Sequence, residues 1–183
     1  SCCVKLQVVM FSNYVRPAGI HPNPDRSIPH RSDQHKAALM MKYVDPTKET
    51  FAAFRETDRE GSIHMLNLVR FREKAAYPDG RDVTGAEAYA AYGSESYPVF
   101  SRLGGRIVWR ADFELMLIGP DEETWDECFI AEYPSVSAFV EMIRDPVYRD
   151  AVQHRQAAVL DSRLIRTSPA EVGSGFGSVP DAL

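Results

Sequence analysis

The sequence predicts an α+β domain whose elements follow in the order strand, helix, strand, strand, helix, strand. The run IHMLNLVRF at residues 63–71 is apolar on both faces, as expected for a strand covered on two sides. A helix pattern follows and ends at Gly104 and Gly105, and two further strand patterns come after these glycines. A strand at 127–133, a helical region and a strand at 161–166 complete the order. This topology limits how a pocket could be built but does not define a reaction.

A short helix is expected before the first strand. Asp45 is placed to cap its N-terminus, Pro46 suits its first turn, and Phe51 and Phe54 fall on its inner side. The strand at 63–71 then alternates between two faces. Its odd-numbered face carries Ile63, Met65, Asn67, Val69 and Phe71, and its even-numbered face carries His64, Leu66, Leu68 and Arg70.

The next segment contains a loop, a long helix and two strands. The charged loop at 72–83 is long for a simple connection, and we expect it to act as a lid. Thr84 and Glu87 have the spacing of a capping box and start the helix. The inner stripe of this helix is Ala88, Tyr92, Ser96, Val99 and Leu103. Strands are then expected at 106–110 and 113–118.

The last third of the domain holds two helices between strands. Ser135 is expected to cap the first of them, and Asp145 with Pro146 ends that helix and begins the other. The inner face of the first holds Val136, Phe139, Val140 and Ile143, and one side of the second holds Tyr148, Ala151, Val152, Arg155 and Ala158. The strand at 161–166 closes the domain.

Composition limits the class of protein. The chain has 183 residues, of which 44% are hydrophobic, which suits one domain with a real core. The net charge of −5 argues against a nucleic-acid partner, and no apolar run is long enough for a membrane span. Three cysteines and the lack of a secretory signal pattern favour a reducing, cytoplasmic setting.

The two ends differ from the middle of the chain. Residues 21–30 are polar and interrupted by prolines, so we expect residues 1–40 to be a leader or extension. Residues 41–169 are expected to form the folded domain. The Ser-, Gly- and Pro-rich residues 170–183 are expected to form a flexible tail.

Familiar catalytic motifs are missing from the sequence. It contains no G-x-S-x-G, H-E-x-x-H or C-x-x-C, and no G-x-G-x-x-G between a strand and a helix. The two histidines of the expected domain, His64 and His154, lack metal-ligand spacing. We therefore expect neither a metal nor a cofactor.

His64 is the candidate catalytic residue. It shares a strand face with Leu66, Leu68 and Arg70, so its imidazole would project from an apolar surface, where a general base could act. The alternative is a structural histidine that binds a neighbouring backbone group or lies in a dimer interface.

Five residues are candidates for substrate binding. Arg155 lies on an apolar helix stripe and needs an anion, either from a ligand or from an internal carboxylate such as Glu132 or Glu114. Asn67 must be hydrogen-bonded if it is buried. Tyr89, Tyr92 and Trp109 could line an aromatic pocket, although aromatic residues at such spacing are also typical of a core.

Several motifs carry a family resemblance. They are IHMLNLVRF, the tyrosine pair in EAYAAYG, GGRIVW, WDECFIAEYPS, DPVYRDAVQHRQAA and the closing SRLIR. With these motifs, residues 43–169 resemble domain-of-unknown-function family 1330, within the dimeric α+β barrel superfamily. The resemblance implies a ferredoxin-like βαββαβ unit that pairs with a second copy, so that two sheets close a barrel. Relatives in the superfamily include cofactor-independent monooxygenases, muconolactone isomerases, dye-decolourising peroxidases and chlorite dismutases, which is an analogy of fold alone.

Together these observations predict a homodimer with a small, largely apolar pocket between the sheet and the helices, which transforms a small organic molecule bearing a carboxylate or carbonyl group. The expected mechanism is cofactor-independent proton transfer by His64, as in oxygenase, isomerase or lactone chemistry. Arg155 would anchor the anion, and Asn67 or Tyr92 would orient the substrate. The alternative is a non-catalytic small-ligand-binding or stress-related dimeric module. A hydrolase ranks third, since no motif for one is present.

Overall fold

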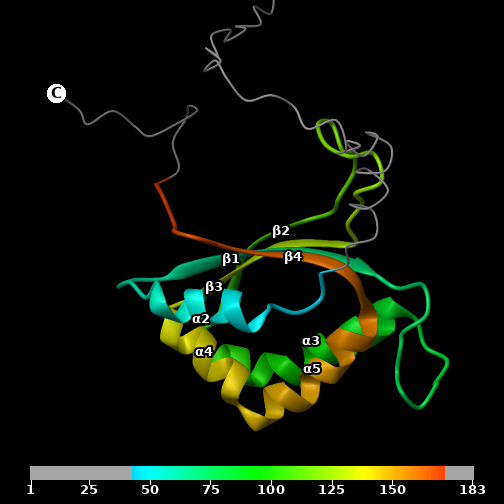
Figure 1. Cartoon of the computed structure of the whole chain (residues 1–183), viewed down its shortest axis with the longest axis horizontal. Helices are drawn as coiled ribbons and strands as arrows, with labels where there is room; N and C mark the ends of the chain where they lie inside the picture. The colour runs from blue at the N-terminus through cyan, green and yellow to red at the C-terminus, as the bar shows by residue number, and fades with distance from the viewer. Residues whose placement is uncertain (1–42, 172–183) are drawn as a thin grey trace, which may run out of the picture. The chain divides into compact units, whose positions relative to one another are not determined.

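The computed structural model describes residues 43–171. The expectations for a leader at 1–40 and for the tail from residue 172 onward lie outside these residues. Figure 1 shows the described part as two layers, with a twisted sheet on one side and helices on the other. None of the helices in this part is long and apolar enough to cross a membrane.

The sheet has the strand order of a ferredoxin-like unit. Its strands are β1 (Ile63–Phe71), β2 (Arg106–Ala111), β3 (Glu127–Tyr133) and β4 (Val159–Thr167). They lie in the order β2-β3-β1-β4, and every neighbouring pair is antiparallel. The βαββαβ fold class expected from the sequence is confirmed.

The helices lie against one face of this sheet (Figure 1). They are α2 (Lys48–Glu56), α3 (Gly85–Arg102), α4 (Val136–Arg144) and α5 (Pro146–Ala158). The main core contains the odd-numbered side chains Ile63 and Met65 of β1, which pack with Val99, Phe139 and Tyr148 of the helices. Burying each large apolar side chain stabilises the fold by about 1.5–3 kcal/mol, which makes this layer the main source of stability.

Local signals in the sequence explain most helix ends. Thr84 and Glu87 form both halves of the expected capping box at the start of α3. Gly104 follows α3 with a φ of 77°, a conformation that glycine adopts without strain. Ser135 caps α4, and Asp145 both ends α4 and caps α5.

The start of the first described helix differs from the expectation. Asp45 does not cap α2, because Thr47 does so by accepting a hydrogen bond of 3.2 Å from the backbone N–H of Thr50. Asp45 lies instead beside α5, where it contacts Arg155 and accepts a hydrogen bond from Gln156. Both Asp45 and Thr47 are good capping residues, so their order along the chain could not decide between them.

The strand expected at 113–118 is wrong. Residues 112–126, called the arm below, connect β2 to β3 without joining the sheet. The base of the arm is fixed, since the N–H of Asp126 donates to the carbonyl of Val69 at 2.8 Å. The Asp126 side chain in turn accepts from the N–H of Phe71 at 2.7 Å. In Figure 1 the arm rises on the side of the sheet away from the helices.

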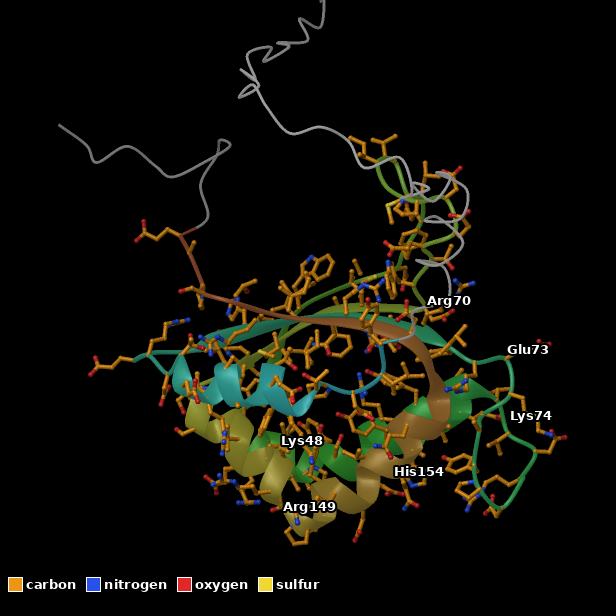
Figure 2. All side chains as sticks on the ribbon, in the orientation of Figure 1. Lys48, Arg70, Glu73, Lys74, Arg149 and His154 are labelled. Atoms are coloured by element: carbon orange, nitrogen blue, oxygen red, sulfur yellow. The ribbon has the colours of Figure 1, made fainter. Side chains whose placement is uncertain are left out.

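The loop expected to act as a lid lies on the helix side of the sheet, where Figure 2 labels Glu73 and Lys74. Its stem is fixed by backbone hydrogen bonds. Ala75 N donates to Val83 O, and Ala76 N donates to Ala157 O at the end of α5, each at 2.9 Å. The loop therefore packs against α5.

Candidate functional site

The face of the sheet away from the helices, called the open face below, carries the candidate site. Cross-strand partners in an antiparallel sheet point to the same side, so the strand register assigns residues to this face. Its members are His64, Leu66, Leu68 and Arg70 of β1, Arg106, Trp109 and Ala111 of β2, Cys128, Ile130 and Glu132 of β3, and Asp161, Arg163, Ile165 and Thr167 of β4. Within residues 43–171, no helix covers this face (Figure 1).

A histidine–carboxylate pair lies at one end of the open face. His64 and Glu132 are direct cross-strand partners, and Nε2 of His64 lies 2.9 Å from Oε2 of Glu132. The His64 side chain is 22% exposed and that of Glu132 is 18% exposed, so the pair is largely shielded from water. An ionised Glu132 can only accept a hydrogen bond, so Nε2 carries the proton and Nδ1 is left as the basic nitrogen.

Arg106 also contacts the carboxylate of Glu132. Its Nε donates to the other carboxylate oxygen, Oε1 of Glu132, at 2.9 Å. The hydrogen bonds from Arg106 and then from His64 lower the pKa of Glu132, because both favour the charged carboxylate. Glu132 thus stays ionised at neutral pH and fixes the orientation of the imidazole. A carboxylate that orients a histidine in this way also stabilises the imidazolium that forms when the histidine takes a proton.

An apolar row crosses all four strands next to the pair. Trp109, Ile130, Leu66 and Ile165 follow one another in register from β2 to β4. Trp109 and Ile165 are each 46% exposed, although both are large apolar side chains. The open face therefore offers an apolar floor beside the polar His64–Glu132 pair, a combination that is common in small-molecule sites.

The other candidate residues lie on the opposite side of the sheet. Asn67 is on the helix side, where its Nδ2 donates to the carbonyl of Met65 at 2.8 Å. Tyr89 packs against Tyr92 with ring centroids 5.4 Å apart, and the Tyr92 hydroxyl lies 3.2 Å from that of Tyr148. Burial raises the pKa of Tyr89 and of Tyr148, so both hydroxyls stay protonated. The sheet itself separates Asn67, Tyr89 and Tyr92 from His64 and Trp109. A single substrate therefore cannot contact both groups.

Arg155 has internal partners. Its guanidinium donates to the backbone carbonyl of Val44 and, at 3.2 Å, to Oγ of Ser162, and it lies 3.5 Å from Asp45. The carboxylate beside it is Asp45, not the Glu132 or Glu114 expected from the sequence. Arg155 thus links α5, β4 and the segment that leads into α2.

Sequence reasoning missed the partnership between His64 and Glu132 and the role of Arg106. Both His64 and Glu132 are polar residues on strand faces that are otherwise largely apolar. A polar residue on each of two largely apolar strand faces predicts a cross-strand pair, but only after the antiparallel pairing of the two strands is known.

The described residues offer no alternative to the open face in a surface depression or in a metal-binding cluster. A surface depression of about 320 Å³ is lined by Asp58, Arg59, Glu60, Gly61, Ser135 and Ser137, and none of these belongs to the open face. Among residues 43–171, no three His, Cys, Asp or Glu side chains are arranged to hold a metal ion.

Comparisons with known proteins support a single family. Residues 80–167 match the family described as Domain of unknown function (DUF1330). Over 74% of this chain and 100% of the other, the sequence is 71% identical to the methylated RPA0582 protein, with a TM-score of 0.72. RPA0582, a protein of unknown function from Rhodopseudomonas palustris, also matches in a second crystal structure with 70% identity over 72% of this chain and 100% of the other, at a TM-score of 0.70.

A weaker structural likeness exists to a dimeric protein of unknown function and ferredoxin-like fold from Bacteroides fragilis. It is 10% identical over 58% of this chain and 94% of the other, with a TM-score of 0.38. No curated protein matches the sequence. The match to the family description and the identity to RPA0582 along its whole length show that this chain belongs to the DUF1330 family.

Proposed function

We propose that the protein catalyses cofactor-independent proton transfer on a small organic molecule that carries a carbonyl or carboxylate group. The site is the open face, and His64 is the base. The observation that carries this proposal is the 2.9 Å contact between His64 Nε2 and the ionised Glu132, which leaves Nδ1 as a proton acceptor.

The chemistry requires only the residues already described. Nδ1 of His64 takes a proton from a carbon next to a carbonyl group, and the electron pair of the broken C–H bond remains on the substrate as an enolate. Glu132 stabilises the imidazolium that forms. Returning the proton to a different carbon gives an isomer, whereas a reaction of the enolate with oxygen would give an oxygenated product.

Substrate binding is assigned to Trp109 and Arg106. Trp109 offers a half-exposed aromatic surface in the apolar row. The Arg106 side chain is 70% exposed and holds Glu132 through Nε, so its terminal nitrogens are accessible to a substrate carboxylate. Arg106 takes the role of anion anchor that the sequence suggested for Arg155.

We also propose that the protein is a homodimer and that a second copy covers the open face. The motivation is the apolar row of Trp109, Ile130, Leu66 and Ile165, since contiguous apolar surface of this kind marks an interface or a binding site. Covering the face would also exclude water from His64, which strengthens its interaction with Glu132.

Proton abstraction can be tested without knowledge of the natural substrate. The full-length protein is incubated in D2O with a panel of β-keto acids, 1,3-dicarbonyl compounds and unsaturated lactones, and the loss of C–H signals is followed by proton NMR. We expect accelerated exchange of at least one compound. We also expect His64→Gln to reduce this rate by a factor of about 10²–10⁴, the usual contribution of a general base.

His154→Gln is the matched control, because His154 is the other histidine of the described residues and lies on α5, away from the open face (Figure 2). It should keep the exchange rate per folded molecule. Equal rates for His64→Gln and the unaltered protein would refute the role of His64, and no exchange with any compound of the panel would count against the enzyme itself.

A non-catalytic ligand-binding or structural role for the same residues has one observation in its favour. The chain of contacts from Arg106 through Glu132 to His64 links three adjacent strands, which a purely structural cluster would also do. In that case His64→Gln would lower the melting temperature and leave ligand-dependent exchange unaffected. Measuring melting temperature and exchange on the same variant distinguishes the two functions.

A further inference from the structure

The arm exposes apolar side chains to an unusual degree. Leu115, Leu117 and Ile118 are 75%, 85% and 91% exposed, whereas no other leucine or isoleucine of the described part is more than 49% exposed. Exposing three large aliphatic side chains within four residues has a cost in water, which a partner surface would remove.

The sequence of this segment is typical of a strand that pairs with another surface. Five of the six residues at 113–118 are apolar, with Glu114 as the exception, and a short apolar run of this kind is typical of a strand. In the described residues this segment makes no strand pairing. The expected partner is therefore outside the single domain described here.

The base of the arm directs it away from its own sheet. Asp126 is hydrogen-bonded to Val69 and Phe71, and Nη1 of Arg70 donates to the carbonyl of Glu122 at 3.1 Å. These bonds fix the base at the end of β1 far from His64. From there the arm rises on the side of the open face, beyond the sheet (Figure 1).

Interface area favours a second copy as the partner. Four strands about 4.8 Å apart and about 23 Å long present roughly 400 Å² of flat face in projection. A stable interface typically buries about 800 Å² on each partner. The arm rises on the same side of the sheet as the open face (Figure 1), so a second copy that covers both buries more area than the flat face alone provides.

We propose that the arm of one copy lies across the open face of a second copy and supplies part of the wall of the His64 site. This inference rests on the proposed pairing of open faces. In a two-fold symmetric dimer both arms make the same contact, so each site contains side chains from two chains. Leu117 and Ile118 would contact the apolar row of the other copy, and a substrate would lie between them and Trp109.

A photo-crosslinking experiment tests this contact directly. The photoreactive residue p-benzoylphenylalanine replaces Leu117 in the full chain, and copies labelled with ¹⁴N and ¹⁵N are mixed, exchanged and irradiated. We expect mixed-isotope crosslinks to peptides of β1, β2 or β4 that contain Leu66, Trp109 or Ile165. The same photoreactive residue at Val147, which is 52% exposed on α5, is the control and should give no crosslink to these peptides.

A second measurement distinguishes the contribution of the arm to dimerisation from the contribution of the paired open faces. By sedimentation velocity, Leu117→Asp should raise the dimer dissociation constant about tenfold or more, as expected for a residue central to an interface, and Val147→Asp should not. A monomeric unaltered protein at micromolar concentration would refute the pairing of faces. A dimer that Leu117→Asp leaves unchanged, with crosslinks only within one chain or to residues 1–42, would refute the arm contact alone.

Discussion

The hydroxyl of Tyr77 lies 2.5 Å from Nδ1 of His154, and the other ring nitrogen of His154 lies 3.2 Å from a carboxylate oxygen of Glu95. This contact joins the loop at 72–83 to α5 and, through Glu95, to α3. Burial raises the pKa of Tyr77, so its hydroxyl remains protonated and can donate to the imidazole. The expected lid is thus held against the helix layer by a side-chain contact in addition to its backbone bonds.

Removing the Tyr77 hydroxyl should loosen this loop. Tyr77→Phe keeps the ring but loses the hydrogen bond to His154, which costs about 1 kcal/mol. We expect faster amide hydrogen exchange at Ala75 and Ala76, with exchange in β1 unchanged. Tyr97→Phe, at a position 63% exposed on α3, is the control and should have no effect. Unaltered exchange at Ala75 in Tyr77→Phe would show that the backbone bonds alone fix the loop.

Glu132 should make stability depend on pH in the acidic range. Its pKa is lower in the folded protein than the ordinary value of 4.5, so folding favours the ionised form. The resulting stabilisation is complete above pH 4.5 and is lost as the pH falls through the pKa that Glu132 has in the folded protein. Urea unfolding between pH 3 and about 7 should show a shallower decline for Glu132→Gln than for the unaltered protein. Glu141→Gln, at an exposed position on α4, should retain the original slope.

Two glycines of α3 should respond oppositely to alanine. A Cβ at Gly85 would lie 2.2 Å from the carbonyl oxygen of Arg72 and 2.9 Å from that of Ala158, whereas a Cβ at Gly93 would meet nothing within 4 Å. Gly85→Ala should reduce the free energy of unfolding by about 1–3 kcal/mol through overpacking. Gly93→Ala should raise it by about 0.5–1 kcal/mol, since alanine favours a helix interior. Urea unfolding of both variants measures the contrast, and a neutral Gly85→Ala would mean that the Arg72 backbone can move.

Arg155 should prove to be structural. Arg155→Met removes the donors to Val44 and Ser162, so we expect the free energy of unfolding to fall by about 1–3 kcal/mol. In the deuterium-exchange assay the rate per folded molecule should be unchanged, because Arg155 lies on the helix side of the sheet. A stable variant with reduced exchange would show that Arg155 contributes to substrate binding.

Local patterns predicted the fold more fully than the site. The bounds of β1 and β3 agree with the expected runs, since apolar strands and the capping box at Thr84 are signals contained in a few neighbouring residues. The helix expected from Asp45 begins later, because two suitable caps lie close together. The segment at 113–118 is a short apolar run typical of a strand, but a strand needs a partner, and composition cannot show whether one is available.

The site depends on pairings between distant parts of the chain. His64 and Glu132 are 68 positions apart, and only the register of β1 with β3 brings them together. The sequence alone assigns Asn67 and His64 to opposite faces of the sheet, since odd and even positions of a strand point to opposite sides. The internal partners of Arg155 come from the segment before α2 and from β4, a contact that no local pattern indicates.

The irregularity in β2 affects how copies of this protein can meet. β2 is an edge strand, and its register shifts between Ile107 and Trp109, which leaves Val108 as an extra residue without a cross-strand partner. Such a bulge twists the strand and interrupts the row of free backbone groups that another strand would need for pairing. Edge-to-edge addition, which could continue without limit into fibrils, is thereby disfavoured at β2, whereas the proposed association through the open face would end with two copies.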